Sequence, residues 1–407
     1  MIRFNNLLVR YKFYLLLWGF LFLLNCQLFK KSQSFERLKN IEKYYNYSNL
    51  NKIFRFSKAK IPIPFDIKKD SIVIDKKKIT TSRQCGKCHK TAYANWSKSR
   101  HKVAFTNKLY KESHRKEPHI WCVNCHAPLH EVGTGINDMR SRIQKEDGVS
   151  CIVCHVREKK IITASIPQKK PGKTYAHKYE IIPQMKEAKF CGECHQFNFP
   201  TAASARNARG IIKYTNQVMQ NTLNEYLTSG FIDRSNCQDC HLQPRSRNSH
   251  LFNGGHDIEL LKKSLFVSIK KIKTSDDLYK LTVYSMGIGH AFPTGDLFRT
   301  LKVRVLDNKK KVTIANFILR KDYRNFTSDE QDDEKPAKYL FKDGSILEPV
   351  GNEIASSRIF YFRYAVKLTK VLVEMHIDYL HDVSNLISTM SLKTTRPLIK
   401  KEFIAVE

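Results

Sequence analysis

The chain of 407 residues contains one short pattern five times: two cysteines separated by two residues and followed at once by a histidine. A zinc ribbon or a thioredoxin-type redox pair also uses two cysteines at this spacing, but neither requires histidine as the next residue. Five immediate histidines therefore indicate five covalently attached c-type haems. The cysteines are Cys85, Cys88, Cys122, Cys125, Cys151, Cys154, Cys191, Cys194, Cys237 and Cys240, and the histidines are His89, His126, His155, His195 and His241.

The motif chemistry assigns a role to each of these side chains. The two thiols form thioethers to the haem vinyl groups, and the histidine binds the iron through a neutral imidazole nitrogen. Five haems within residues 85–241 leave little room for an ordinary apolar core, so the haems are expected to form much of the core and to lie close together. Such a cluster provides a path for electrons, with each potential set by the axial ligands and by burial.

The N-terminal residues have the pattern of an export signal. Residues 1–12 contain three basic side chains and no acidic one, and an apolar run interrupted by one glycine follows over Phe13–Leu24. The next residues, Asn25 and Cys26, resemble the end of a bacterial lipobox, in which Cys26 would be lipidated, although Asn25 departs from the usual small residue. A plain signal peptide and an uncleaved anchor are the alternatives. All three predict an exported chain, in the periplasm or at the outer membrane surface, and lipidated Cys26 would anchor it to a membrane.

The distribution of motifs suggests four parts. We expect a signal peptide over 1–25, a lysine-rich tether over 26–80, a pentahaem cytochrome c domain over 81–258 and a β-sandwich-like domain over 259–407. The gaps between successive motifs are 37, 29, 40 and 46 residues, which is too irregular for a solenoid repeat. Ala202–Leu227 lacks proline and has apolar residues at roughly helical spacing, so it is predicted to form the longest helix.

The C-terminal part has a different character and no cysteine. Several of its segments are rich in valine, isoleucine, phenylalanine and tyrosine, with partial alternation and turns between them. They predict an antiparallel β-sandwich of about seven short strands, so the fold class is α+β, with a mainly helix and loop multihaem domain in front of the sandwich. The segments are 265–272, 278–285, 301–306, 311–319, 359–368 and 371–379.

The formal net charge of +33 does not predict nucleic-acid binding, because the lysines are spread along the chain and do not form one basic arm or helix. Five haems would also add roughly ten negative charges through their propionates. The remaining positive charge favours acidic redox partners and anionic lipid surfaces.

Ten histidines outside the motifs could serve as second axial ligands: His101, His114, His119, His130, His177, His250, His256, His290, His376 and His381. His114 lies among charged residues, as on a solvated face, and His376 and His381 lie on the expected C-terminal strands. These three are discounted. The other seven exceed the number that five irons require.

The first motif, Cys85-Gly-Lys-Cys-His89, is followed by Trp96-Ser-Lys-Ser-Arg-His101, and this arrangement resembles the opening haem motif of the cytochrome c554 and hydroxylamine oxidoreductase superfamily. The resemblance covers roughly residues 83–320. Further similar segments are Cys122-Val-Asn-Cys-His-Ala-Pro128, Gly148-Val-Ser-Cys151, Ala176-His-Lys-Tyr179, Met219-Gln-Asn-Thr222 with Glu225-Tyr226, His250-Leu-Phe-Asn-Gly-Gly-His-Asp257 and Gly289-His-Ala-Phe-Pro-Thr-Gly295.

This resemblance implies that His101, His177, either His250 or His256, and His290 are distal ligands. His119 and His130, which flank the second motif, are further candidates. His290 would come from the β domain, where Pro293 and Gly295 make a turn that could hold its imidazole against a haem of the other domain. The alternative is a simple hairpin with His290 as a capping residue.

Three functions fit these features. In the first, the chain carries electrons between other redox proteins or quinol-linked donors through irons that have two histidines each. The second is an oxidoreductase acting on nitrite or hydroxylamine, which requires an open iron; all five motifs end in histidine, and none is the Cys-x-x-Cys-Lys form that marks the catalytic haem of pentahaem nitrite reductases. The third is a haem-bearing sensor or interaction lipoprotein. We expect a carrier and not an enzyme.

Overall fold

The computed structural model describes residues 72–74, 77–79, 81–116, 120–129, 145–157, 160–166, 177–206, 213–242, 250–295, 297–307, 312–326, 335–336, 338–379 and 398–406. All of them belong to one compact unit, Phe54–Glu407. The expected signal segment 1–25, Cys26 and most of the tether lie outside these residues. Within the described part of the chain, no helix is long and apolar enough to cross a membrane.

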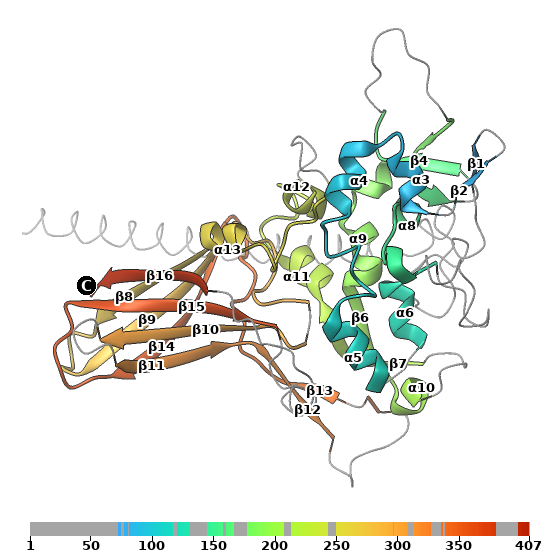
Figure 1. The fold of residues 1–407 in the computed structure, drawn as a ribbon. Helices are drawn as coiled ribbons and strands as arrows, with labels where there is room; N and C mark the ends of the chain where they lie inside the picture. Colours follow the sequence, from blue (N-terminus) through green and yellow to red (C-terminus); the bar gives the residue numbers. More distant parts are fainter. Residues whose placement is uncertain are drawn as a thin grey trace, which may run out of the picture. The chain divides into compact units, whose positions relative to one another are not determined.

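Short helices carry the haem motifs (Figure 1). Four of them end at the motif histidine, so each cysteine pair lies within a single helical turn or two directly before the ligand. At the first motif, Cys85 lies in one helix and the next helix begins directly after His89. The helices are α3 (Ser82–Gly86), α4 (Lys90–Trp96), α5 (Lys108–Lys116), α6 (Ile120–His126), α8 (Cys151–His155), α9 (Ala188–His195), α10 (Ala202–Arg206), α11 (Thr222–Thr228), α12 (Cys237–His241) and α13 (Ile258–Ser264), with the 3-10 helix η2 (Pro183–Lys186).

Small sheets connect these helices. The antiparallel pair β6–β7 is the longest of them, and it begins directly after the fourth motif. The other strands pair as β1–β2 and as a three-stranded set β3–β4–β5. Their bounds are β1 (Ile72–Ile74), β2 (Lys77–Ile79), β3 (Val156–Arg157), β4 (Lys160–Thr163), β5 (Glu180–Ile181), β6 (Gln196–Pro200) and β7 (Tyr214–Asn221).

The predicted long helix over Ala202–Leu227 is wrong. The described residues of this segment form α10, then β7, then α11. β7 takes part in backbone pairing with β6, in which Gln196 lies opposite Asn221 and Asn198 lies opposite Val218. Apolar spacing over a short segment does not separate a helix from a strand, and here pairing with a distant strand decided the outcome.

Nine strands follow among the described residues of the C-terminal region. Six of them fall on the predicted segments, although β14 begins and ends earlier than the predicted 359–368. They are β8 (Leu265–Lys271), β9 (Leu278–Met286), β10 (Thr300–Asp307), β11 (Thr313–Leu319), β12 (Lys321–Asn325), β13 (Lys338–Asp343), β14 (Ala355–Arg363), β15 (Lys370–Asp378) and β16 (Leu398–Ala405).

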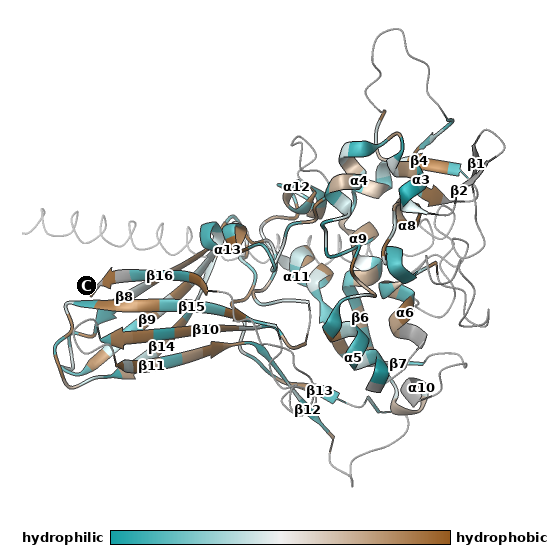
Figure 2. Ribbon diagram, in the orientation of Figure 1, coloured by the Kyte–Doolittle hydropathy of each residue, from teal (hydrophilic) through white to brown (hydrophobic). Residues whose placement is uncertain are grey.

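These strands form antiparallel sheets in the orders β11-β10-β15-β16, β14-β9-β8 and β12-β13. Alternate residues of the first two sheets meet in one hydrophobic core, in which Leu281 of β9, Val303 of β10 and Val373 of β15 are fully buried. Hydrophilic and hydrophobic residues are mixed along these strands (Figure 2), and Ile318 and Ile359 are exposed on the outer faces. Burial of each such side chain stabilises the region by about 1.5–3 kcal/mol, so this core is a firm base for the loops at its ends.

The β region contacts the haem region through several of its loops and through the β12–β13 hairpin. The Tyr323 hydroxyl donates a hydrogen bond of 3.3 Å to the carbonyl of Met219 in β7. The backbone nitrogen of Gly230 donates to the carbonyl of Pro349 at 2.8 Å. The Tyr379 hydroxyl, at the end of β15, donates to the carbonyl of Gly255 at 2.6 Å.

Candidate haem centres

The structure places four of the five motif histidines opposite a histidine from a distant part of the chain. In all four pairs, the partner belongs to the set that the sequence predicted as distal ligands. The distances between ring centres are 6.0 Å for His89 and His177, 6.3 Å for His195 and His101, 6.2 Å for His155 and His250, and 6.2 Å for His241 and His290.

This spacing fits an iron between two imidazoles. Such an iron would hold the two ring centres about 6 Å apart, because a metal–nitrogen bond is about 2 Å long and a ring nitrogen lies about 1.1 Å from the centre of its ring. Rings in direct stacking contact lie closer, as the 4.0 Å between Tyr110 and His126 shows. The four pairs therefore have room for a haem iron between their rings.

Hydrogen bonds orient several of these imidazoles. A backbone carbonyl can only accept, so an Nδ1 atom beside it donates, and Nε2 remains available to a metal. This arrangement holds His126 with Ala104 (2.8 Å), His155 with Ile162 (3.0 Å), His241 with Asn253, His290 with Ala291 (2.9 Å) and His177 with Lys178 (3.2 Å). His101 differs, because its buried Nδ1 has no hydrogen-bond partner among the described residues.

Burial keeps several of the paired imidazoles neutral, which is the form that binds iron. It lowers the pKa of His101 to about 3 and that of His195 to about 4, and the neighbouring His241 adds to both shifts. Burial likewise lowers the pKa of His290 to about 4. In His89, burial and the adjacent His177 lower the pKa in the same direction.

Contacts between cysteines bring separate motifs together. A hydrogen bond to Cys151, followed by burial, raises the pKa of the Cys85 thiol, so the first and third motifs lie side by side. A hydrogen bond from Cys191 lowers the pKa of Cys237, so the fourth and fifth motifs are also adjacent. These pKa shifts belong to the free thiols, because a thioether does not titrate.

The second motif has a different environment. The ring of Tyr110 in α5 stacks on His126, with 18° between the ring planes, and is only 8% exposed. The ring of His114 also stacks on Tyr110, with 5.5 Å between the ring centres. His119 and His130, the candidates nearest this motif in sequence, lie outside the described residues. No sequence pattern pointed to Tyr110, since an aromatic residue in a short helix is usually part of the core.

His256 lies elsewhere than His250. The His256 ring stacks on the Tyr379 ring, with 4.0 Å between the ring centres and 14° between the planes. It does not face a motif histidine among the described residues. Desolvation, followed by the positive charges of Arg100 and Arg299, lowers the pKa of His256. Of the two alternatives, therefore, the structure brings His250 to a motif histidine and brings His256 to the β region.

Arg299 supplies positive charge beside the fourth and fifth motifs. Its Nη1 donates to the carbonyl of Thr294 at 2.9 Å, while its buried Nε has no hydrogen-bond partner within the described residues. The charge of Arg299 also depresses the pKa values of His195 and His290. A guanidinium in this position suits a carboxylate such as a haem propionate, which would bind it through charge-assisted hydrogen bonds.

Comparison with known proteins found a family match and a similar fold. A model of the family described as cytochrome c554 and c-prime matches residues 84–156, which include the first three motifs. The penta-heme cytochrome c552 from Thermochromatium tepidum has a similar fold, with a TM-score of 0.57 and 18% sequence identity, and the match covers 80% of this chain and 98% of that chain. The findings support a multihaem c-type cytochrome. Haem c is accordingly the cofactor that the motifs and histidine pairs of this chain fit.

Two other solved structures share only weak likeness with this chain. A structural-genomics target from Bordetella pertussis has a TM-score of 0.18 and 7% identity, over 35% of this chain and 92% of that chain. The β-glucuronidase of Bifidobacterium dentium has a TM-score of 0.17 and 10% identity, over 35% of this chain and 18% of that chain. No curated protein matched the sequence.

Proposed function

We propose that the chain is a pentahaem electron carrier in which at least four irons have two histidine ligands. The four histidine pairs, with ring centres 6.0–6.3 Å apart, carry this proposal. When bound, haem c supplies an iron that accepts and releases single electrons. The chain's own side chains would hold each macrocycle through two cysteines and would bind the iron through two histidines, which would leave these irons no position for a substrate.

The contacts between motifs suggest the order of the haems along the path. The first motif adjoins the third through Cys85 and Cys151. Cys194 of the fourth motif packs against the hydrophobic cluster that contains Ile152 and Val153 of the third, and Cys191 adjoins Cys237 of the fifth. His126 donates to the carbonyl of Ala104, three residues after His101, which lies opposite His195, so the second motif joins the path at the fourth. We infer a path from motif one through three and four to five, with motif two as a branch.

Each part of the chain has one role in this proposal. The predicted domain 81–258 holds the haems, and 259–407 is a sandwich-like domain built from the two sheets that share a core. His290, in the loop between β9 and β10, would give the second domain a direct part in the haem of the fifth motif. We also propose that the chain belongs to the wider superfamily that includes hydroxylamine oxidoreductase. The matched family segment covers residues 84–156 only, so this membership is part of the proposal.

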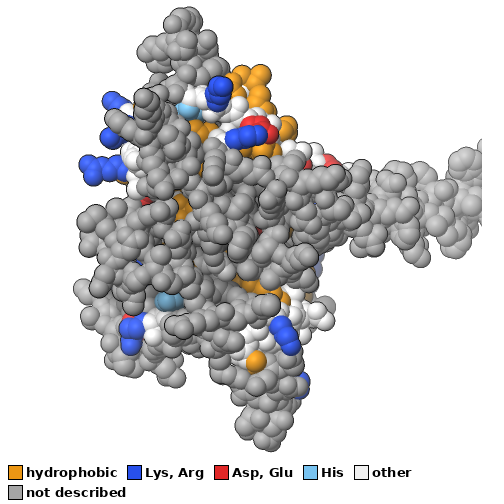
Figure 3. All heavy atoms as spheres, turned by 90° about the vertical axis from the view of Figure 1, so that its right-hand side faces the viewer, with side chains coloured by type: hydrophobic (Ala, Val, Ile, Leu, Met, Phe, Trp, Pro, Cys, Tyr) orange, Lys and Arg blue, Asp and Glu red, His pale blue; other side chains and the backbone are white. Residues whose placement is uncertain are grey.

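We propose the periplasm or the outer membrane surface as the site of action, with lipidated Cys26 as the anchor. Thioether attachment and the basic, apolar N-terminus support an exported chain. Other redox proteins or quinol-linked donors would be the partners. Lysine and arginine side chains lie at several places of the described surface in Figure 3, with a group near the left edge of the view, and such positive charge would favour acidic partners.

The experiment that tests this function compares ligand binding with electron transfer. The dithionite-reduced protein is mixed with CO, nitrite and hydroxylamine, and reoxidation by an acidic redox protein is followed by stopped-flow absorbance. A carrier should transfer electrons to the protein partner and should not turn over nitrite or hydroxylamine. Catalytic turnover of either compound would refute the carrier and favour an enzyme.

A further inference from the structure

Glu225 is a buried carboxylate at the point where the haem region meets the β region. It lies in α11 and is 4% exposed. It is neither a motif residue nor a candidate ligand. An ionised carboxylate at such a depth is costly unless it is paired and hydrogen-bonded, so its partners indicate what it does.

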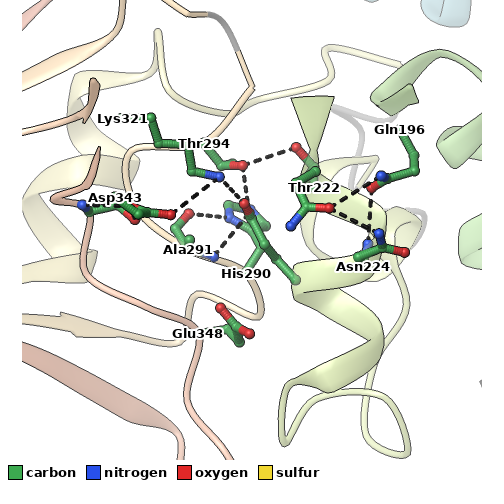
Figure 4. Close-up of polar contacts among 12 residues, drawn as sticks. Gln196, Thr222, Asn224, His290, Ala291, Thr294, Lys321, Asp343 and Glu348 are labelled. Carbon is green, nitrogen blue, oxygen red and sulfur yellow. Dashed lines mark hydrogen bonds and ion pairs between the residues drawn. The ribbon is translucent and has the colours of Figure 1, made fainter. Parts of the chain in front are cut away.

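Three residues of the β region bind this carboxylate. Oε1 pairs with the ammonium group of Lys321 in β12. Oε2 accepts a hydrogen bond of 2.6 Å from the Thr294 hydroxyl and another of 3.3 Å from the backbone nitrogen of Ala291. Ala291 directly follows His290, and the two lie side by side in Figure 4, near Thr294 and Lys321. One side chain of the haem region therefore holds the loop that carries His290.

The β core holds the same loop from the other side. Phe292 is 4% exposed and belongs to the hydrophobic core. Its backbone exchanges two hydrogen bonds of 2.7 Å with Ile346. Gly295 closes the loop with a φ of +86°, a conformation that favours glycine. The backbone on the C-terminal side of His290 is thus fixed between the core and Glu225.

Lys321 makes the burial of Glu225 tolerable. Its side chain is 12% exposed, and its ammonium group also lies 3.9 Å from Asp343 in β13. Removing one partner of a buried ion pair leaves an uncompensated charge, whereas removing both leaves none. Glu225 and Lys321 should therefore act as one unit, and the loss of either should loosen the loop.

We propose that Glu225 and Lys321 form an ionic latch that positions His290 as the distal ligand of the haem attached to Cys237 and Cys240. The proposal rests on the proposed function, because it presumes that His241 and His290 are an axial pair. Both latch residues act through the loop and are positioning residues. The β region then controls whether this one haem is closed or open to external ligands.

The test uses the full-length haem-loaded protein with Glu225→Gln, Lys321→Gln and the double variant. Ferrous CO difference spectra and the low-spin EPR signal are the readouts. Each single variant should bind CO at one haem per chain and lose part of one low-spin signal, while the wild type keeps that haem closed. The double variant should bind no more CO than the singles, since the two residues form one unit.

Reduction potentials distinguish a latch from general loosening. Glu225→Gln removes a negative charge near that haem and should raise its potential, whereas Lys321→Gln removes a positive charge and should lower it. Glu374→Gln is the matched control, because Glu374 is a buried glutamate of β15 that pairs with Lys401 at 3.0 Å. This control should change neither the CO binding nor the potential.

Three outcomes would overturn the proposal. If His290→Gly opens one haem but Glu225→Gln and Lys321→Gln leave it closed, the axial pair stands and the latch is wrong. If His290→Gly alters no haem, the axial pair itself is wrong. If Glu374→Gln opens the haem or shifts its potential as Glu225→Gln does, the effect comes from general loosening of the protein and not from the latch. Thr294→Val, which removes only the hydroxyl that donates to Glu225, provides a milder variant should Glu225→Gln not fold.

Discussion

Replacing Phe292 with alanine should weaken the link between the β core and one haem. The Phe292 side chain lies in the hydrophobic core, and its neighbour Ala291 accepts the Nδ1 hydrogen bond of His290. Truncation removes the aromatic packing that holds this loop, and the backbone hydrogen bonds to Ile346 remain. The change should therefore affect both the stability of the β region and the axial position of His290.

The expected magnitude follows from the burial. Truncation of a buried phenylalanine to alanine costs about 3–5 kcal/mol, through lost transfer free energy and the cavity left behind. For a domain of about 150 residues, each kcal/mol lowers the unfolding temperature by about 2–4 °C, so Phe292→Ala should lower it by about 10 °C. Leu281→Ala removes a fully buried side chain of β9 and should cost about 2–5 kcal/mol, so it is the matched control.

Thermal unfolding is followed by far-UV circular dichroism for the β region and by the Soret band for the haems. In Phe292→Ala, one haem should convert from low spin to high spin below the unfolding midpoint. In Leu281→Ala, the conversion from low spin to high spin should occur only when the β region unfolds. If the β region unfolds in both variants and the Soret band does not change, His290 is not an axial ligand and the reasoning fails.

Two further predictions concern charge. Arg299→Gln should lower the reduction potentials of the haems beside His195 and His290, because a nearby positive charge favours the reduced iron; in spectroelectrochemical titration, the exposed Arg363→Gln should leave them unchanged. Since burial lowers the pKa of His256 to about 3 from 6.5, the unfolded state binds more protons below pH 6.5, and stability should fall between pH 6.5 and pH 3. An equal or higher urea midpoint at pH 5 than at pH 7 would contradict this sign.

Elements whose signals are local could be predicted from the sequence. Six strands of the β region could be predicted because apolar residues alternate along them, as Leu301, Val303 and Val305 do in Thr300–Asp307. The strand Lys321–Asn325 was missed because its residues are mostly polar and its pairing with β13 is not visible in its own pattern. The helix expected over Ala202–Leu227 is wrong for the same reason, because part of this segment pairs with β6 and its own sequence does not show that pairing.

The candidate site also has one part that short patterns predict and another part that only the folded chain shows. The motif cysteines and histidines, and the set of histidines available as partners, could be predicted from short patterns. Which histidine faces which motif could not, because His101 and His195 are far apart in the sequence and only the folded chain brings their rings to 6.3 Å. The resemblance included Glu225 in a similar segment but gave it no role, since a glutamate in a helix usually faces solvent.

The axial pairs are tested most directly by near-infrared magnetic circular dichroism of the oxidised protein, before and after His101→Met. We expect bis-imidazole bands for the four paired haems of the wild type. Replacement of His101 should convert one haem to histidine–methionine ligation and raise its potential. A mainly high-spin wild type, or a spectrum that His101→Met leaves unchanged, would contradict bis-histidine ligation of these haems.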